Sequence, residues 1–336
     1  MPRPSYLLFV FLLAGMIAGL TAAPFTSPTP QTRQIALGDI SQEKPMFRVL
    51  LEPDQDFPPI IAPGPTDWLA MHEEPGQTFG QYISSGANWR NSQRNVIYIL
   101  PLGKFSSANS PSLELLRDYA ARFFQMEAKI LPAYQPTEQE FSPRNNSFTN
   151  ERQILATEIL EFLPTRLPKD AYCLIAVTMD DLYPAPSWNF VFGMANLSTR
   201  VGVFSFARYA QGLDGADNTA LQKQILHRAC KVLVHETGHM CGILHCVYYE
   251  CLLNGSNHLA EADKRPQQLC PVCLRKLKFC IGSGFDPVKR YKELAEFYRK
   301  QGWSEELAWT ERQLAKAESL RKKIESKEQS SLPAKQ

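Results

Sequence analysis

The sequence lacks an excess of charge of either sign. Its 336 residues carry 36 Lys and Arg against 34 Asp and Glu, a formal net charge of +2. Proteins that bind nucleic acid usually show a basic excess or a basic stripe, because phosphate contacts supply much of the affinity. The two short basic clusters, at residues 276–278 and 321–323, are interpreted as solvated faces. The charge pattern therefore predicts no nucleic-acid partner.

Long hydrophobic runs are also missing beyond the first two dozen residues. Residues 7–20 form one apolar run, preceded by Arg3 and followed by the small residues 21–23. Such a run is short for a helix that spans a bilayer and suits the core of a signal peptide. We therefore expect residues 1–23 to be a signal peptide and the protein to be secreted, with no stable membrane association after cleavage. An uncleaved membrane anchor and an intracellular location are the alternatives.

No internal repeat or coiled-coil seam is evident, and the composition changes near residue 95. Residues 24–94 are rich in Pro, Ser, Thr and Gln, which predicts an extended arm on the core. Its candidate anchors are Trp68, Phe79 and Trp89. The sequence does not indicate a function for this Pro-rich N-terminal extension.

Alternating strand-like and helix-like patterns follow the arm. β-Branched and apolar runs predict strands at residues 95–100, 128–131, 171–179, 189–192 and 201–206, the first of them ending at Pro101. Apolar residues at helical spacing predict helices over residues 113–126 and 154–160. This order of elements predicts a three-layer α/β (α+β) domain with a mixed, mostly parallel sheet.

A long helix is expected next, over residues 219–241. Leu226, Ala229, Leu233 and Met240 form its apolar stripe. After Asp286 and Pro287, which suit a helix cap and first turn, two charged helices are predicted at residues 288–299 and 304–326. Residues 286–328 would thus form a C-terminal helical extension, and residues 329–336 a disordered tail.

Histidine is scarce, yet three of the six histidines fall within residues 235–245, in the pattern H-E-x-x-H-x-x-G-x-x-H. His235 and His239 are four residues apart, so a helix presents both imidazoles to one ion. Glu236 can reach a metal-bound water without being a ligand. Gly242 can take the left-handed conformation that ends a helix, and His245 then supplies a third nitrogen. The pattern predicts a catalytic zinc site.

Two buried, hydrogen-bonded histidines on a helix are the alternative for an isolated H-E-x-x-H, but the full eleven-residue pattern favours metal. His72, His227 and His258 have no such neighbours in sequence and are interpreted as ordinary polar histidines.

Five of the eight cysteines lie between Cys241 and Cys273, close to these histidines. The pairs Cys246/Cys251 and Cys270/Cys273 have the spacing of a structural four-cysteine zinc site. Two disulfides are the competing interpretation, given the export signal. Three others, Cys173, Cys230 and Cys241, are expected to be buried thiols, whereas Cys280 could be either. No cysteine nucleophile is indicated.

The complete pattern, with the four cysteines, resembles the archaemetzincin family of metzincin-type zinc peptidases. Residues 187–193, 201–209 and 255–259 also resemble eukaryotic members, and the resemblance covers about residues 95–285. It implies a metzincin-like domain with an active-site helix and a zinc-stapled C-terminal subdomain.

By this similarity, the three histidines bind the catalytic zinc and Glu236 is the general base. The four cysteines, Cys246, Cys251, Cys270 and Cys273, would hold a second zinc ion. The strand near residues 191–196 would pair with an extended substrate.

Two features depart from the family pattern. Archaemetzincins carry a methionine two residues after the second cysteine, beneath the catalytic zinc, and here that position is Leu253. Leucine is apolar and of similar size, so the floor of the site can survive. The export signal is the second departure, because family members are expected to be intracellular.

Together these patterns predict a zinc metallopeptidase that cleaves a peptide or protein substrate. The alternative is a non-catalytic, zinc-stabilised binding protein, supported only by Leu253. A third version is a secreted protein with disulfides and one zinc ion. Metal content and free thiols distinguish these hypotheses.

Overall fold

The computed structural model describes residues 13–14, 25–105 and 110–331. The predicted signal peptide lies outside the described residues apart from Leu13–Ala14, and so do residues 332–336 of the predicted tail. Among the described helices, none combines the length and the apolar character needed to cross a bilayer.

The main sheet has five strands in the order β3-β2-β6-β10-β9. These are β2 (Val96–Leu102), β3 (Glu127–Ile130), β6 (Ala171–Thr178), β9 (Gly193–Asn196) and β10 (Val201–Ser205). The first four run parallel, and the edge strand β9 is antiparallel to β10. All residues of β2 and β6 are buried, as expected for near-continuous apolar strands in the middle of a sheet. The predicted mixed, mostly parallel sheet is confirmed.

The prediction that the first strand ends at Pro101 is wrong, because β2 continues to Leu102. Pairing of β2 with β3 ends at Ile99, whereas pairing with β6 continues. The carbonyl of Pro101 points to the β3 side, where it accepts from Tyr134 N. The N–H and the carbonyl of one strand residue point to the same side. Proline lacks the N–H, and at Pro101 this side is the one on which β2 is no longer paired with β3.

A second sheet, which the sequence did not predict, has the order β1-β8-β7-β5-β4. Its strands are short: β1 (Leu13–Ala14), β4 (Arg144–Asn145), β5 (Arg152–Leu155), β7 (Asp181–Tyr183) and β8 (Phe190–Val191). Residues 154 and 155, predicted as helical, belong to β5, and the helix α6 (Ala156–Phe162) begins only after them. β5 pairs in parallel with β7, which overrides the local helical spacing.

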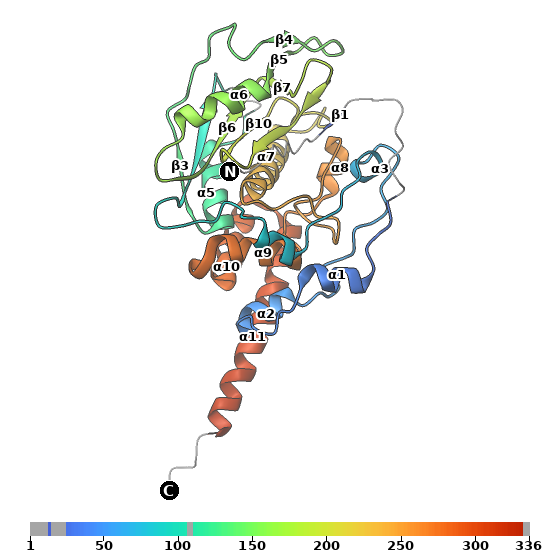
Figure 1. Ribbon diagram of the computed structural model, residues 1–336, viewed down its shortest axis with the longest axis vertical. Helices are drawn as coiled ribbons and strands as arrows, with labels where there is room; N and C mark the ends of the chain where they lie inside the picture. The colour runs from blue at the N-terminus through green and yellow to red at the C-terminus, as the bar shows by residue number, and fades with distance from the viewer. Residues whose placement is uncertain (1–12, 15–24, 106–109, 332–336) are drawn as a thin grey trace, which may run out of the picture.

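Helices surround the main sheet (Figure 1). α5 (Leu113–Phe124) and α7 (Asn218–Met240) pack against the strands and against each other, while α6 and the short η1 (Leu163–Arg166) contact β9 or β10. α7 confirms the predicted long helix, with all four residues of its stripe buried. The Asp217 side chain caps its first turn by accepting from Thr219 N and Ala220 N.

The N-terminal arm is not purely extended. It contains four short helices: α1 (Pro30–Leu37), α2 (Pro45–Leu51), α3 (Trp68–Met71) and α4 (Phe79–Ser84). Thr29 caps α1, and Thr78 forms a capping box with α4, signals that lie within the Pro- and Thr-rich composition. The three expected anchors are confirmed by their ring contacts, although Trp89, which packs edge-on against Phe279, is 38% exposed. Trp68 is only 5% exposed, and the Phe79 ring packs edge-on against Phe279.

The C-terminal part comprises α8 (Leu259–Lys264), α9 (Pro271–Ile281), η2 (Gly282–Gly284), α10 (Pro287–Gln301) and α11 (Ser304–Ser331). α11 extends away from the body of the molecule (Figure 1) and continues to Ser331, beyond the predicted start of the tail at residue 329. Asp286 caps α10 as predicted.

One surface assignment was wrong. Lys276, interpreted as part of a solvated basic cluster, is only 1% exposed, because its Nζ donates to the carbonyl of Gln77 at 2.5 Å. This bond ties α9 to the N-terminal arm.

Candidate metal centres

The three histidines of the motif converge. His235 and His239 lie on the last turns of α7, which ends at the C-cap Cys241. Gly242 follows with φ of 83°, in the left-handed region that a side chain would strain, and the chain turns back to His245. One ring nitrogen of each histidine lies within 4.8 Å of the others, and the Nε2 atoms of His235 and His239 are 2.9 Å apart.

Hydrogen bonds on the far side of each ring determine which nitrogen faces the centre. Nδ1 of His235 lies 2.9 Å from the carbonyl of Leu252, and Nδ1 of His239 lies 2.6 Å from that of Ile243. Nδ1 of His245 lies 2.7 Å from Glu74 Oε1. Because these oxygens only accept, each Nδ1 carries the proton and each Nε2 offers a lone pair.

This arrangement fits a metal cation. Two Nε2 lone pairs at 2.9 Å repel each other unless a cation lies between them, and Nε2 of His245 is buried without a hydrogen-bond partner among the described residues. Burial lowers the pKa of His235 to about 3 and that of His239 well below its usual range, so both rings are neutral, as metal ligation requires.

Glu236 lies beside this centre in a dry environment. It is 1% exposed, and its Oε2 has no hydrogen-bond partner among the described residues. Burial raises its pKa to about 8, a shift that a nearby cation would oppose. A Cβ added to Gly193 would lie 2.9 Å from Glu236 Oε1, so glycine is needed where β9 passes the carboxylate. Glu236 therefore adjoins the edge strand of the main sheet.

Leu253 occupies the position where the family pattern has methionine. It is fully buried, and a Cβ added to Gly238 would lie 2.9 Å from Leu253 Cδ2. Gly238 lies on α7 between His235 and His239, within one turn of both. Leu253 thus packs directly beneath the helix that carries both histidines.

The four predicted cysteines also converge. The sulfurs of Cys246, Cys251, Cys270 and Cys273 lie within 4.8 Å of one another, and Cys246 Sγ is 3.6 Å from Cys270 Sγ. A tetrahedral zinc site with Zn–S of about 2.3 Å would separate its sulfurs by about 3.8 Å. Burial raises the pKa of Cys251 and Cys270 well above the usual range, whereas hydrogen bonds with the other three thiols outweigh burial at Cys246 and lower its pKa. The cluster fits a closed four-thiolate metal site.

All eight cysteines fall within the described residues, and all are buried and free of disulfides. The expectation of buried thiols at Cys173, Cys230 and Cys241 is confirmed. Cys280 is also a buried thiol, 3.1 Å from the hydroxyl of Tyr172.

The other histidines do not join the three-histidine centre. His227 pairs with Glu306 at 2.7 Å, and His258 contacts Asp67 at 3.1 Å while its Nδ1 accepts from Glu261 N. His72 stacks on Trp68 with ring centroids 3.9 Å apart. These contacts agree with their interpretation as ordinary polar histidines.

The sequence analysis missed Glu74, which contacts His245 from a position 171 residues away. No motif spacing links two positions so distant, and the arm had no assigned function. Burial opposes ionisation of Glu74, but its hydrogen bonds with His245 and Trp68 outweigh this and lower its pKa.

The chain is similar in sequence to known proteins. A model of Peptidase family M54 matches residues 169–279. Archaemetzincin-2 of Pongo abelii is 37% identical over 284 residues, which cover 76% of this chain and 78% of that protein. Archaemetzincin-2 of Mus musculus is 37% identical over 279 residues, 74% of this chain and 77% of that protein. A crystal structure of archaemetzincin from Archaeoglobus fulgidus, complexed with malonate, is 30% identical, covers 54% of this chain and 99% of its own, and gives a TM-score of 0.42. The chain belongs to the archaemetzincin family of zinc metallopeptidases.

Proposed function

We propose that this chain hydrolyses peptide bonds at the three-histidine centre, with His235, His239 and His245 as ligands of a catalytic zinc ion. The observation that carries the proposal is the convergence of three imidazoles beside a buried carboxylate. Cys246, Cys251, Cys270 and Cys273 would hold a second, structural zinc ion, since four thiolates leave no open position for a substrate.

Glu236 is the general base in this proposal. When bound, zinc supplies Lewis-acid chemistry, which makes water more acidic and polarises a carbonyl group. Glu236 takes a proton from the attacking water at Oε2, the oxygen that has no partner among the described side chains. The protonated carboxyl then donates to the nitrogen of the departing amine. Burial favours the protonated carboxyl and a bound cation would favour the carboxylate, so Glu236 can both take up and release a proton.

The substrate is proposed to be a peptide or protein segment in extended conformation. β9 is the edge strand of the main sheet, and Gly193 brings its backbone against the Glu236 carboxylate. An extended peptide that pairs with β9 would therefore pass its backbone in front of the base.

Glu236→Gln tests the assignment, because it keeps the size of the side chain and removes the base. We expect two zinc ions per chain in both proteins, and a loss of turnover of about 10²–10⁴-fold on a panel of quenched peptides. A chelator should abolish cleavage by the unchanged protein. Undiminished cleavage by Glu236→Gln would refute the role of Glu236, and no cleavage by the zinc-loaded unchanged protein would favour the non-catalytic binding protein.

A further inference from the structure

The third histidine is held differently from the other two. His235 and His239 use backbone carbonyls of Leu252 and Ile243, which lie close to them in sequence. The partner of His245 is a side chain, Glu74, which comes from the N-terminal arm. Residue 74 lies outside the segment 169–279 that the family model matches. We propose that Glu74 is a positioning residue of the metal centre, which orients His245 for zinc and makes the arm part of the active site.

Glu74 is itself fixed by Trp68. The indole Nε1 of Trp68 donates to the same oxygen, Glu74 Oε1, at 2.9 Å. The Trp68 ring stacks on His72 on one side and meets the His245 ring edge-on, with centroids 5.1 Å apart. A Cβ added to Gly255 would lie 2.4 Å from the Trp68 ring, so the indole lies directly on backbone. Glu74 therefore has little freedom to leave His245.

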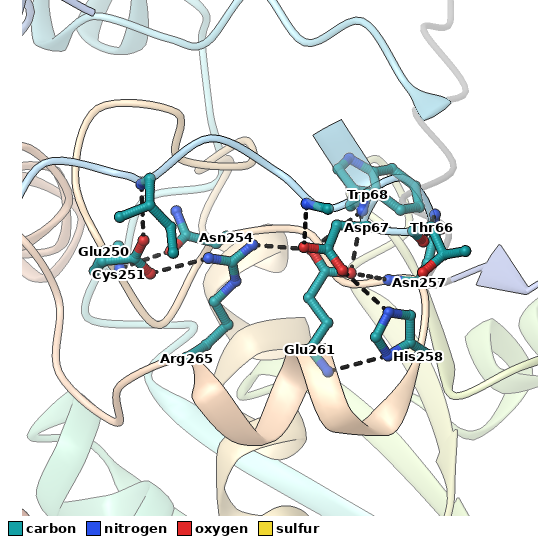
Figure 2. A network of polar contacts seen from close by, with 12 residues as sticks. Thr66, Asp67, Trp68, Glu250, Cys251, Asn254, Asn257, His258, Glu261 and Arg265 are labelled. Carbon is teal, nitrogen blue, oxygen red and sulfur yellow. Dashed lines mark hydrogen bonds and ion pairs between the residues drawn. The ribbon is translucent and has the colours of Figure 1, made fainter. Parts of the chain in front are cut away.

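Trp68 is anchored in turn by a polar network between the arm and residues 250–265, which include α8, as Figure 2 shows. The backbone N–H of Trp68 donates to both oxygens of Glu261 at 3.1 Å. Arg265 lies between Glu261 and Glu250, at 2.9 Å from each. The carboxylate of Glu261 is thus fully occupied by protein donors, which is why this network serves as an anchor.

The neighbouring side chains of Asp67, His258 and Glu261 are three possible metal ligands that lie close together, yet their polar atoms form hydrogen bonds within the protein. His258 Nδ1 accepts from Glu261 N, and Asp67 Oδ2 accepts from Gly64 N. These bonds hold residue 67 next to Trp68 and so support the same anchor. A series of hydrogen bonds thus connects Glu261 of α8 to Trp68, Trp68 to Glu74, and Glu74 to His245.

A carboxylate in this place has a defined chemical effect. Because it can only accept, it keeps the proton of His245 on Nδ1, makes Nε2 the ligand atom and increases its basicity. Removing such a partner from a metal-binding histidine typically weakens metal affinity 10–100-fold. A merely structural glutamate would lower stability without a specific effect on the histidine-bound metal.

The inference rests on the proposed zinc site, and its test measures metal binding rather than hydrolysis. Glu74→Gln and Glu74→Ala are compared with the unchanged chain and with Glu73→Gln, the same chemical change at the exposed adjacent residue. Each protein is loaded with cobalt(II), whose visible bands distinguish a three-histidine site from a four-thiolate site. Chelator competition then gives the affinity of each site separately.

We expect both Glu74 variants to lose 10–100-fold in affinity at the histidine site, Ala more than Gln, with a changed histidine-site spectrum. The four-cysteine site and Glu73→Gln should be unaffected. Trp68→Phe, which keeps an aromatic ring but removes the N–H donor and part of the ring volume, should weaken the histidine site to a smaller extent. If Glu74→Ala fails to fold, Glu74→Gln still decides the matter.

Affinity within twofold of the unchanged protein in Glu74→Gln, with an identical histidine-site spectrum, would overturn the role of Glu74. An equal loss at the four-cysteine site would also overturn it, because Glu74 would then support the fold in general. If the unchanged chain bound no metal at the histidines, the proposed function itself would fail, and that result is distinct from either outcome.

Discussion

The contact between Gly238 and Leu253 gives a quantitative test of the floor of the metal centre. Leu253 is fully buried, and a Cβ on Gly238 would lie 2.9 Å from its Cδ2 and 3.6 Å from its Cδ1. Gly238 therefore makes room for Leu253 under α7. Two single variants, Leu253→Ala and Gly238→Ala, and their combination measure how strongly these two residues depend on each other.

The expected free energies follow from packing. Leu253→Ala removes a buried side chain and leaves a cavity, which costs about 2–5 kcal/mol of unfolding free energy. Gly238→Ala gains about 1 kcal/mol of helix propensity, but overpacking costs about 1–3 kcal/mol, so alone it should be neutral or destabilising. In the Leu253→Ala background the added methyl enters the cavity, and only the gain remains. The coupling energy should thus be about 1–3 kcal/mol.

Urea unfolding of all four proteins at one fixed concentration of free zinc measures the coupling. Leu253→Met is the matched control, since it conserves volume and restores the family residue at a cost below about 1.5 kcal/mol. Additive effects, with a coupling below about 0.5 kcal/mol, would refute the proposed packing of Leu253 against Gly238. A large destabilisation by Leu253→Met would refute the view that leucine replaces methionine at this place without loss.

Two further predictions concern charged groups away from the metal centres. The carboxylate of Asp56 accepts from Arg312, Gln313 and Lys316 of α11; burial opposes its ionisation, but the bonds with Lys316 and Arg312 prevail and lower its pKa. Its stabilisation is therefore complete above the unfolded pKa of about 4 and is lost as the pH falls through the lower folded value. Asp56→Asn should cost roughly 1–3 kcal/mol at pH 6 and progressively less as the pH is lowered below about 4, as urea midpoints will show. Arg208 binds Asp181 through two bonds of 2.9 and 2.7 Å, with the side chains 8% and 1% exposed. Asp181→Asn should leave Arg208 partly unpaired and cost about 3–5 kcal/mol in thermal or urea unfolding; a loss below about 1 kcal/mol would contradict this.

The elements that the sequence predicted well carry a long periodic signal. α7 spans 23 residues with a regular apolar stripe and a side-chain cap, and its bounds agree with the prediction to within one residue. The buried strands β2 and β6 have seven and eight residues, and all of them except Thr178 are apolar. The metal-binding motif is similarly local, since its spacing within residues 235–245 already determines which side chains share a face.

The elements that the sequence did not reveal are short or depend on distant partners. β5 has four residues, which fit a helix as well as a strand until β7 pairs with them. The helices of the arm have four to eight residues, and α1, α2 and α4 obtain their stability from packing on α9 or α11. Lysine usually lies on the surface. The burial of Lys276 is explained only by its hydrogen bond to the carbonyl of Gln77, which is far away in sequence.

The turn that follows His245 links the two metal centres through the backbone. Cys246 N donates to the carbonyl of Leu253, and the Asn254 side chain bridges the backbone of Cys246 and Cys251. The carbonyl of Leu252, inside this turn, is the partner of His235. With zinc at the four cysteines as proposed, the ion would fix the turn and hence the orientation of His235. In that case zinc at the four cysteines would hold His235 through the backbone of the turn, whereas the side chain of Glu74 contacts His245.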